Sequence, residues 1–504
     1  MAAPATPPTD AGPAPPGSGG AVVEVARRSA APGLVLVLVC LGQFMVVLDV
    51  SVVNVALPSI RADLGFTASS LQWVVNAYTL AFAGFLLLGG RAADIFGRRR
   101  MFLIGVALFG VASLLGGLAT NSAELVAARA VQGLGGAVLS PATLTILLTT
   151  YGDPGARARA LGVWSAVAAA GGTSGALVGG VLTDLLSWRW ILFVNVPIAI
   201  GVLLGARLFV AESRNSTATR HLDVLGAATA TGGLVAIVTG IVRTESQGWG
   251  SLEVLAWLAA GVVLLAVFVL VESRVARAPI FPFRLLRSRS LVAANAVMFS
   301  LGGAMFALWY FLTLHMQLVL GESPLQAGLG FMPQTLMIMT GAQISSRLLP
   351  RIGARPLLVA GPLLIAIGLV GLSRAGADGD YLHGVLLQGM VTTFGFGLSM
   401  PAVTLAATAG VARAEAGLAS GIVQTTRQMG GSLGLAALAA VAAGRTADLA
   451  GRSSPLVALD GGFTRAFTVG AVVAGSAALA ALMLPGREPR RRPSAEVEAE
   501  AAAA

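Results

Sequence analysis

Apolar segments of about 20 residues recur along nearly the whole chain, and each is long enough to cross a lipid bilayer as a helix. The first runs past Leu48 to Pro58 without a convincing signal-peptide cleavage site, so we expect it to be retained. Thirteen more follow at about 71–89, 101–120, 125–148, 160–182, 190–210, 223–242, 252–271, 291–319, 327–346, 356–373, 383–409, 417–441 and 464–484. Charged residues make up only 11% of the chain, against about 25% in soluble domains. The sequence therefore excludes a soluble globular protein and predicts an all-α integral membrane protein with fourteen transmembrane helices.

Arginines alternate between the two ends of these expected helices, as they do where basic loops mark the cytoplasmic side of a membrane protein. One side holds 23 of the 33 basic residues and the other holds seven. Both termini are therefore expected in the cytoplasm. The Arg-only, Ala- and Gly-rich composition suggests a bacterium with a GC-rich genome, so we expect a multi-pass protein of the bacterial cytoplasmic membrane. The net charge of +10 then reflects orientation and contact with anionic lipid, and no nucleic-acid partner is expected.

The chain contains no lysine, which removes the lysine of a phosphate-binding loop. No nucleotide partner and no ATPase activity are therefore expected. The single cysteine, Cys40, permits no internal disulfide, and the three histidines, His221, His315 and His383, lie too far apart for a local metal motif. We expect no metal, no cofactor and no enzymatic activity, so the energy for any transport must come from another source.

The turn between the second and third expected helices combines glycines with charges. It reads Gly90-Arg91-Ala92-Ala93-Asp94-Ile95-Phe96-Gly97-Arg98-Arg99-Arg100. The glycines at 90 and 97 suit a tight turn, and Asp94 can pair with the guanidinium of Arg98 or Arg99. Such a pair can latch two helices in one conformation. The alternative is that the arginines serve membrane orientation alone.

The fifth expected helix is rich in glycine, with Gly162, Gly171, Gly175, Gly179 and Gly180 along its length. Small residues spaced four apart let two helices approach closely, so plain helix packing is one interpretation. The unusual density of the spacing favours a more specific role.

Two charged residues fall inside expected membrane helices. Asp49 lies in the first, where a carboxyl group is costly, commonly faces a cavity and can take up a proton near neutral pH. Arg129 lies in the fourth, and its permanent charge can hold an anion or influence a nearby carboxyl group. Proton coupling is the favoured interpretation of Asp49 and Arg129, and a structural ion pair is the alternative.

Several of these strings resemble those of the major facilitator superfamily. The turn at 90–100 is similar to the superfamily's loop G-x-L-A-D-R-x-G-R-R, with departures at Ala92 and Ile95. The glycines of the fifth helix look like the antiporter motif of its proton-driven drug exporters, with Ala176 in place of the expected proline. Residues 48–58 resemble the first helix of fourteen-span drug–proton antiporters of the EmrB/QacA type. Further matches lie at 73–78, 129–133, 188–197, 321–328 and 420–431, so the resemblance covers roughly residues 35 to 435.

The resemblance implies two six-helix bundles, at 33–212 and 276–486, with two inserted helices at 213–275. A disordered cytoplasmic arm at 1–32 and a cytoplasmic tail at 487–504 complete the expected organisation. The substrate site would lie between the bundles near the middle of the membrane. Candidate cavity residues are Asn54, Trp73, Asn76, Tyr78, Gln132, Tyr310, His315 and Arg427. For His315 and Arg427, packing or pairing within the fold stays open as the alternative.

The resemblance also implies a monomer in the lipid bilayer that exports amphipathic drugs or antibiotics in exchange for protons, driven by the proton-motive force through alternating access. A dedicated exporter of an endogenous secondary metabolite or lipid, which would give self-resistance, is the alternative. A membrane sensor without flux is the second alternative. Because the expected spans hold few acids besides Asp49, the sequence favours neutral, zwitterionic or monocationic hydrophobic compounds as substrates.

Overall fold

The computed structural model describes residues 32–214, 221–276, 279, 281–376, 379–409, 411 and 415–484. Within these ranges the chain is helical and forms no strand, apart from an isolated bridge between Ala450 and Ser453. The expected all-α fold is confirmed. The expected arm at 1–32, apart from Pro32, and the expected tail at 487–504 lie outside the described residues.

The first part of the chain forms α1 (Pro32–Leu64), α2 (Trp73–Phe96), α3 (Arg98–Gly117), α4 (Ser122–Thr150), α5 (Pro154–Leu185), α6 (Trp190–Phe193) and α7 (Asn195–Phe209). Then come α8 (Val224–Gln247), α9 (Leu252–Leu270), α10 (Arg289–Leu314), α11 (Pro324–Ile352), α12 (Ala354–Leu372), α13 (Leu387–Thr408), α14 (Ala416–Leu449) and α15 (Pro455–Ala481). Short π-helical turns extend α9 as η1 (Val271–Val275) and α10 as η3 (His315–Val319), and another, η4 (Tyr381–Leu386), leads into α13. A 3-10 turn, η2 (Phe283–Arg287), precedes α10.

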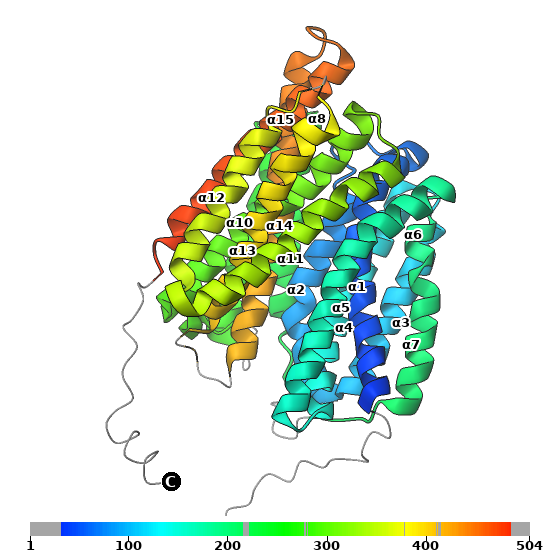
Figure 1. Cartoon of the computed structure of the whole chain (residues 1–504), viewed down its shortest axis with the longest axis vertical. Helices are drawn as coiled ribbons and strands as arrows, with labels where there is room; N and C mark the ends of the chain where they lie inside the picture. Colours follow the sequence, from blue (N-terminus) through cyan, green and yellow to red (C-terminus); the bar gives the residue numbers. More distant parts are fainter. Residues whose placement is uncertain are drawn as a thin grey trace, which may run out of the picture.

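The helices group into two bundles (Figure 1), and a hairpin packs against both of them. Helices α1 to α7 pack mainly on one another and form the first bundle, while α10 to α15 form the second. The hairpin of α8 and α9 contacts both bundles, through α2 of the first and α14 of the second. The fold is therefore two six-helix bundles plus two inserted helices. The exact boundaries expected at 33–212, 213–275 and 276–486 stay predictions.

Among the described residues, 13 helical spans are long and apolar enough to cross a membrane, with α6 and α7 counted as one. Helix α11 is as long, at 29 residues, but is more polar. Its Gln334 and Ser345 are fully buried, so this polarity faces protein rather than lipid. With α11 the expected fourteen crossings are present.

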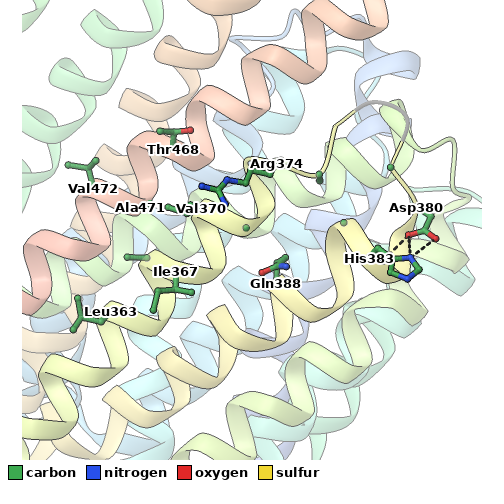
Figure 2. A pocket seen from close by; sticks show the side chains of 15 residues that line it. Leu363, Ile367, Val370, Arg374, Asp380, His383, Gln388, Thr468, Ala471 and Val472 are labelled. Carbon is green, nitrogen blue, oxygen red and sulfur yellow. Dashed lines mark hydrogen bonds and ion pairs between the residues drawn. The ribbon is translucent and has the colours of Figure 1, made fainter.

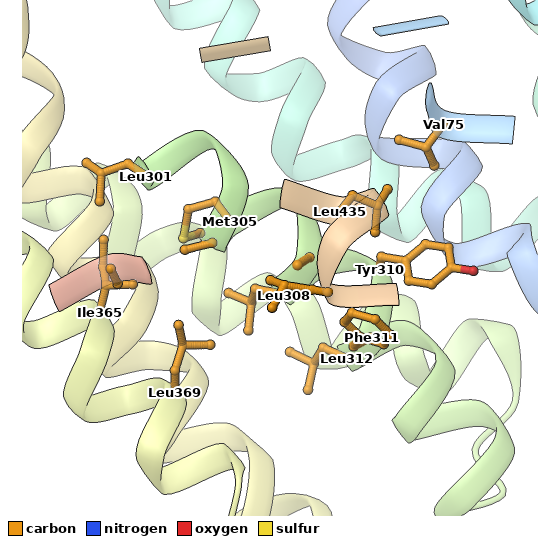
Figure 3. Close-up of a cluster of buried hydrophobic side chains, with 14 of the residues drawn as sticks. Val75, Leu301, Met305, Leu308, Tyr310, Phe311, Leu312, Ile365, Leu369 and Leu435 are labelled. Atoms are coloured by element: carbon orange, nitrogen blue, oxygen red, sulfur yellow. The ribbon is translucent and has the colours of Figure 1, made fainter. Parts of the chain in front are cut away.

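The core of the second bundle surrounds α10, which is apolar on almost every face (Figure 3). Its Leu301 and Leu308 are buried in the same cluster as Ile365 of α12 and Leu435 of α14. A helix that is apolar all round must be covered on all sides, so α10 fixes the positions of its neighbours.

Some helices run further than the apolar segments in the sequence. Helix α1 continues through Pro58 to Leu64, and α15 begins at Pro455, about two turns before the expected 464. Proline removes one backbone donor without ending every helix, and the polar turns beyond the apolar run keep their helical hydrogen bonds outside the expected hydrocarbon layer.

The two bundles meet closely at one end of the molecule. The side at which α1 begins and α15 ends, lower in Figure 1, is called the termini side here, and the opposite side the far side. On the far side, a Cβ atom added to Gly180 of α5 would lie 2.6 Å from the carbonyl oxygen of Pro324, and one added to Gly328 of α11 would lie 2.5 Å from that of Ala176. Nε2 of Gln317 also donates to the carbonyl oxygen of Val55, at 2.8 Å. The far side is therefore closed by backbone-to-backbone contact.

We predict that Gly328→Ala weakens this contact, because the new methyl group would overlap the backbone of α5. Overpacking of this kind costs about 1–3 kcal/mol, so the apparent melting temperature of the purified protein in detergent should fall. Gly162→Ala is the matched control, since nothing lies within 4 Å of that position. Equal melting temperatures for the two variants would contradict the assigned contact.

Candidate functional site

Asp49 and Arg129 form an ion pair inside the first bundle. Nη1 of Arg129 donates to Oδ2 of Asp49 at 2.5 Å, and the two residues are 0% and 2% exposed. Gln132, one turn further along α4, donates from Nε2 to Oδ1 of Asp49 at 2.6 Å and accepts from Nη1 of Arg129 at 2.6 Å. The spacing of three residues places Arg129 and Gln132 on the same face of α4, so both reach one carboxylate of α1.

Three further helices contribute to this cluster. Nδ2 of Asn195, at the start of α7, donates to Oδ1 of Asp49 at 3.3 Å, and Gln132 also donates to Oγ of Ser113 on α3 at 2.8 Å. From α2, the carbonyl oxygen of Val74 accepts from Nε of Arg129 at 3.0 Å. Asp49 therefore accepts hydrogen bonds from one arginine and two amide side chains, on α4 and α7.

Tyr78 of α2 separates the ion pair from a central cavity. The guanidinium carbon of Arg129 lies 4.5 Å from the centroid of the Tyr78 ring, and Tyr78 itself lines the cavity. Asp49 and Arg129 do not belong to the cavity wall, although the neighbouring Val50 and Ser51 do. A change in the position of Tyr78 would therefore act on the cavity and on the ion pair together.

The central cavity has a volume of about 290 Å³ and lies between the two bundles. It is lined from the first bundle by α1, α2, α4 and α5 and from the second by α10, α11, α13 and α14. Three of the candidate cavity residues from the sequence, Asn54, Tyr78 and Arg427, are part of its wall. A cavity at the interface of two bundles, lined by apolar groups with a few polar ones, is a typical small-molecule site.

The other candidates lie elsewhere. Gln132 belongs to the cluster around Asp49, and Asn76 is fully buried on α2, where Nδ2 lies 3.4 Å from Oε1 of Gln72. Trp73, the first residue of α2, packs against a small apolar cluster formed with α8 and α14. Tyr310 is fully buried in an apolar cluster that includes residues of both bundles, and Figure 3 shows it beside Val75 of α2. Its neighbour Trp309 lines the cavity instead.

His315 lies near the far side, away from the cavity wall. Its Nδ1 is 3.2 Å from Oδ1 of Asp460 on α15, and its ring packs against Phe463. Glu322 lies in the loop between η3 and α11, where burial raises the pKa of its carboxyl group and His315 partly offsets that shift. His315, Asp460 and Glu322 form a small polar group at the far end of the second bundle.

The turn between α2 and α3 is tied to the end of α7. Gly97 has φ of +111°, a conformation that favours glycine, and an added Cβ would lie 2.5 Å from the carboxylate of Glu212. That carboxylate accepts from the backbone N–H groups of Arg99 and Arg100 at 3.2 and 3.1 Å, at the N-terminus of α3. Glu212 lies more than 100 residues from the turn, so no local pattern could reveal it.

Three charged side chains of the turn, those of Asp94, Arg98 and Arg99, form hydrogen bonds within the first bundle. Nη2 of Arg98 donates to Oδ1 of Asp94 at 3.1 Å, and Nη2 of Arg99 donates to the carbonyl oxygen of Arg207 at 2.6 Å. Gly90 lies against Pro141 of α4. The expected latch residues thus come together, and none of these contacts reaches the second bundle.

The glycines of α5 serve two different contacts. A Cβ at Gly171, Gly175 or Gly179 would meet α1, at Phe44, Ser51 and Val52 respectively. Gly180 and Ala176 instead face α11 across the interface between the bundles, while Gly162 has open space around it. The motif therefore packs α5 against α1 on one face and against the second bundle on another.

A larger hollow, of about 800 Å³, lies on the outer face of the second bundle between α12, α13 and α15 (Figure 2). Its wall carries Arg374 and the hydrogen-bonded pair of Asp380 and His383, where His383 holds the pKa of the Asp380 carboxyl group below its ordinary value. Leu363 and Ile367 on the same wall are 46% and 61% exposed, as expected of a surface that faces lipid. This hollow shares no residue with the central cavity.

Sequence reasoning missed several residues of the cavity wall. They are Gln43, Ser51, Ser140, Thr335, Gln424 and Gln428, together with Phe82, Phe306, Phe331 and Phe396. The polar ones fall inside apolar helices, which is a usable signal of a protein-facing position, but a phenylalanine in such a helix carries none. Within the described residues, no group of three or more His, Cys, Asp or Glu side chains is placed to hold a metal ion.

The chain is similar to known membrane transport and resistance proteins. The family model described as Major Facilitator Superfamily matches residues 39–435. The Cephamycin export protein CmcT of Amycolatopsis lactamdurans is 48% identical over 81% of this chain and 84% of that protein. The Puromycin resistance protein pur8 of Streptomyces alboniger is 43% identical over 90% of this chain and 91% of its own length. These matches confirm the resemblance that the sequence motifs indicated.

Solved structures show the same fold at low sequence identity. An auto-inhibited peptide transporter of the POT family superposes with a TM-score of 0.68 at 14% identity, over 91% of this chain and 99% of that chain. A D-xylose-proton symporter superposes with a TM-score of 0.63 at 17% identity, over 90% of this chain and 98% of that chain. At these identities the similarity concerns the fold alone.

Removing either charge of the Asp49–Arg129 pair is predicted to destabilise the first bundle, by about 3–5 kcal/mol where a buried charge is left unpaired. Asp49→Asn leaves a guanidinium that cannot lose its proton, whereas Arg129→Gln leaves a carboxyl group that can take one up. Asp49→Asn should therefore lower the apparent melting temperature more than Arg129→Gln does. The double substitution should lower it by less than the sum of the two single changes. Strictly additive changes in a detergent melting assay would show that the two side chains are not coupled.

Proposed function

Because the chain belongs to the major facilitator superfamily, we propose that it exports small amphipathic molecules across a bacterial cytoplasmic membrane in exchange for protons. The observation that carries the proton-coupled part is the buried pair of Asp49 and Arg129, held by five helices of one bundle beside the central cavity. The family consists of multi-pass membrane transporters, and the proposed transport involves no enzymatic reaction. A single chain encloses the cavity, so a monomer is sufficient.

The termini side is the cytoplasmic side in this proposal. The clusters Arg98–Arg100, Arg157 and Arg159, and Arg347 and Arg351 lie in the end turns of α3, α5 and α11, at the helix ends that the helix order places on that side. Loops rich in arginine remain in the cytoplasm during membrane insertion. The far side, where α5 and α11 touch, is then the extracellular side.

Protonation of Asp49 is the coupling step. As an ionised group it accepts hydrogen bonds from Arg129, Gln132 and Asn195, and a proton on the carboxylate would remove the charge that holds Arg129. The freed guanidinium would press on Tyr78, whose ring lies between it and the cavity. Proton binding and cargo binding would thus influence one another through Tyr78 without sharing a site.

The arrangement of contacts corresponds to a cavity closed on the extracellular side. The bundles touch there through Gly180, Gly328 and the hydrogen bond from Gln317, whereas the bonds of Arg98 and Arg99 on the cytoplasmic side lie within the first bundle. In the opposite conformation, Asp94 and the Arg98–Arg99 pair would latch the cytoplasmic ends of the two bundles. Alternation between the two states moves the cargo outward.

The relatives support antibiotics as the cargo class. One is named as an exporter of cephamycin and others as resistance proteins for puromycin and lincomycin. Because each of these names a single compound, a dedicated exporter of an endogenous metabolite is the second candidate function. Transport of many unrelated compounds would favour multidrug efflux, and transport of one would favour self-resistance.

Asp49→Asn is predicted to abolish export driven by a pH difference, because asparagine cannot carry the proton. Efflux of anionic, neutral and cationic hydrophobic dyes from proteoliposomes with an imposed pH difference measures this, and dye exchange without a pH difference reports whether the variant is folded. Asp153→Asn is the control, since Asp153 is exposed and asparagine also caps a helix well. Undiminished pH-driven export by Asp49→Asn would remove Asp49 from the mechanism.

Asp94→Asn is predicted to slow transport roughly tenfold, as expected of a lost contact that favours one conformation. Its melting temperature should hardly change, because the Asp94–Arg98 pair is partly exposed and such pairs stabilise by about 0–1 kcal/mol. Initial rates in the same proteoliposomes give the comparison. A loss of stability that matches the loss of rate would mean that Asp94 serves the first bundle alone.

A further inference from the structure

Arg427 of α14 presents an unpaired positive charge in the wall of the central cavity. Its Nε atom is buried without a hydrogen-bond partner, and no ion pair reaches its guanidinium among the residues that the structure describes. An arginine inside a membrane is costly and is normally paired or exposed to a water-filled cavity. Its retention here without a partner calls for a counter-charge from outside the protein.

The cavity itself supplies no acid. Arg427 is the one charged side chain in its wall, and the remaining polar groups are hydroxyls and amides such as Asn54, Gln424 and Gln428. Asp49 is close in sequence to wall residues, but its carboxylate is engaged by Arg129 and Gln132. The cavity in this conformation therefore carries a net positive charge.

The helices around Arg427 also lack acids. Helices α10, α11, α12 and α13 contain no Asp or Glu. On α14 and α15 the acids are Asp448 and Asp460, both near the far side, and Glu415 just before α14 is paired with Arg284. No rearrangement inside the membrane part of the second bundle would bring a carboxylate to Arg427.

The rest of the wall suits a flat apolar body. Phe306, Trp309, Phe331 and Phe396 line the second-bundle side, and the rings of Trp309 and Phe331 lie with centroids 5.0 Å apart. Next to Arg427, Oε1 of Gln428 is buried without a partner. An aromatic wall beside a guanidinium fork matches a hydrophobic ring system that carries a carboxylate, because the fork binds a carboxylate with two parallel hydrogen bonds.

We propose that Arg427 binds the carboxylate of the transported compound, so that the cavity selects hydrophobic monocarboxylates over their neutral and cationic analogues. The proposal deepens the function above and rests on it. It also departs from the neutral, zwitterionic or monocationic substrates expected from the sequence: Asp49 lies outside the wall, and nothing in the cavity favours a cation.

Equilibrium binding tests the selectivity without any gradient. Pyrenebutanoate, pyrenebutanamide and pyrenebutylammonium share one ring system and differ in charge, and their fluorescence anisotropy reports binding to the purified protein in detergent. The carboxylate should bind roughly tenfold to a hundredfold more tightly than the amide, as expected of hydrogen bonds to a charged group. Arg427→Gln should remove most of this difference by weakening carboxylate binding far more than amide binding, and Arg427→Lys should restore part of it because lysine keeps the charge but not the fork.

Arg445→Gln is the matched control, since it removes a positive charge from the exposed far end of the same helix. It should leave all three affinities unchanged. If Arg427→Gln weakens the three probes equally, or if the wild-type protein binds the amide or the ammonium as well as the carboxylate, the proposal is overturned. A melting temperature of Arg427→Gln close to that of the wild-type protein shows that the variant is folded.

Flux in proteoliposomes separates this inference from the function on which it rests. Export of all three probes at similar rates under a pH difference would support the transport function and overturn the selectivity. Selective binding of the carboxylate without any pH-driven flux would overturn the transport function and leave the binding site standing. Selective export of pyrenebutanoate that is lost in Arg427→Gln supports both.

Discussion

The first bundle is organised around one buried charge pair. Asp49 and Arg129 are both out of contact with solvent, and side chains or backbone from α2, α3, α4 and α7 complete their hydrogen bonds. Two charges taken out of water are stable only when their geometry and remaining hydrogen bonds are satisfied. The relative positions of these five helices are therefore tied to the hydrogen bonds of a single buried ion pair.

The contact between the bundles is of a different kind. On the far side it includes close backbone approach at Gly180 and Gly328 and the hydrogen bond from Gln317 to Val55, and nearer the middle Thr79 of α2 and Ser432 of α14 share a further hydrogen bond of 2.6 Å. Such a surface has shape complementarity without strong pairing, so it can separate without leaving buried charges unsatisfied. A rigid first bundle and a separable interface are the two properties that a rocking motion requires.

The sequence predicts the helices and the important charged residues well, but it predicts poorly whether a given side chain points into the cavity or into the core. Asp49, Arg129, Asp94 and Arg98 stand out because charge inside or beside apolar segments is rare. Helix α10 gives no such signal, because it is apolar on all faces; Trp309 lines the cavity while Tyr310, about 100° further around the helix, is buried in the core. The contact of Glu212 with the turn at Gly97 could not be predicted from the sequence, because more than 100 residues separate the two and only the three-dimensional fold brings them together.

Charge is distributed unequally between the two halves of the molecule. The first bundle holds a carboxylate and an arginine that neutralise each other, whereas the second holds a lone arginine at the cavity. With an anionic cargo, a proton moving in and a carboxylate moving out both carry current in the same direction, down an inside-negative voltage, and each elementary charge gains about 2.3 kcal/mol per 100 mV. With a neutral cargo, only the proton gains this energy. For one anion exchanged against one proton, the electrical potential therefore counts twice in every cycle, and the pH difference counts once.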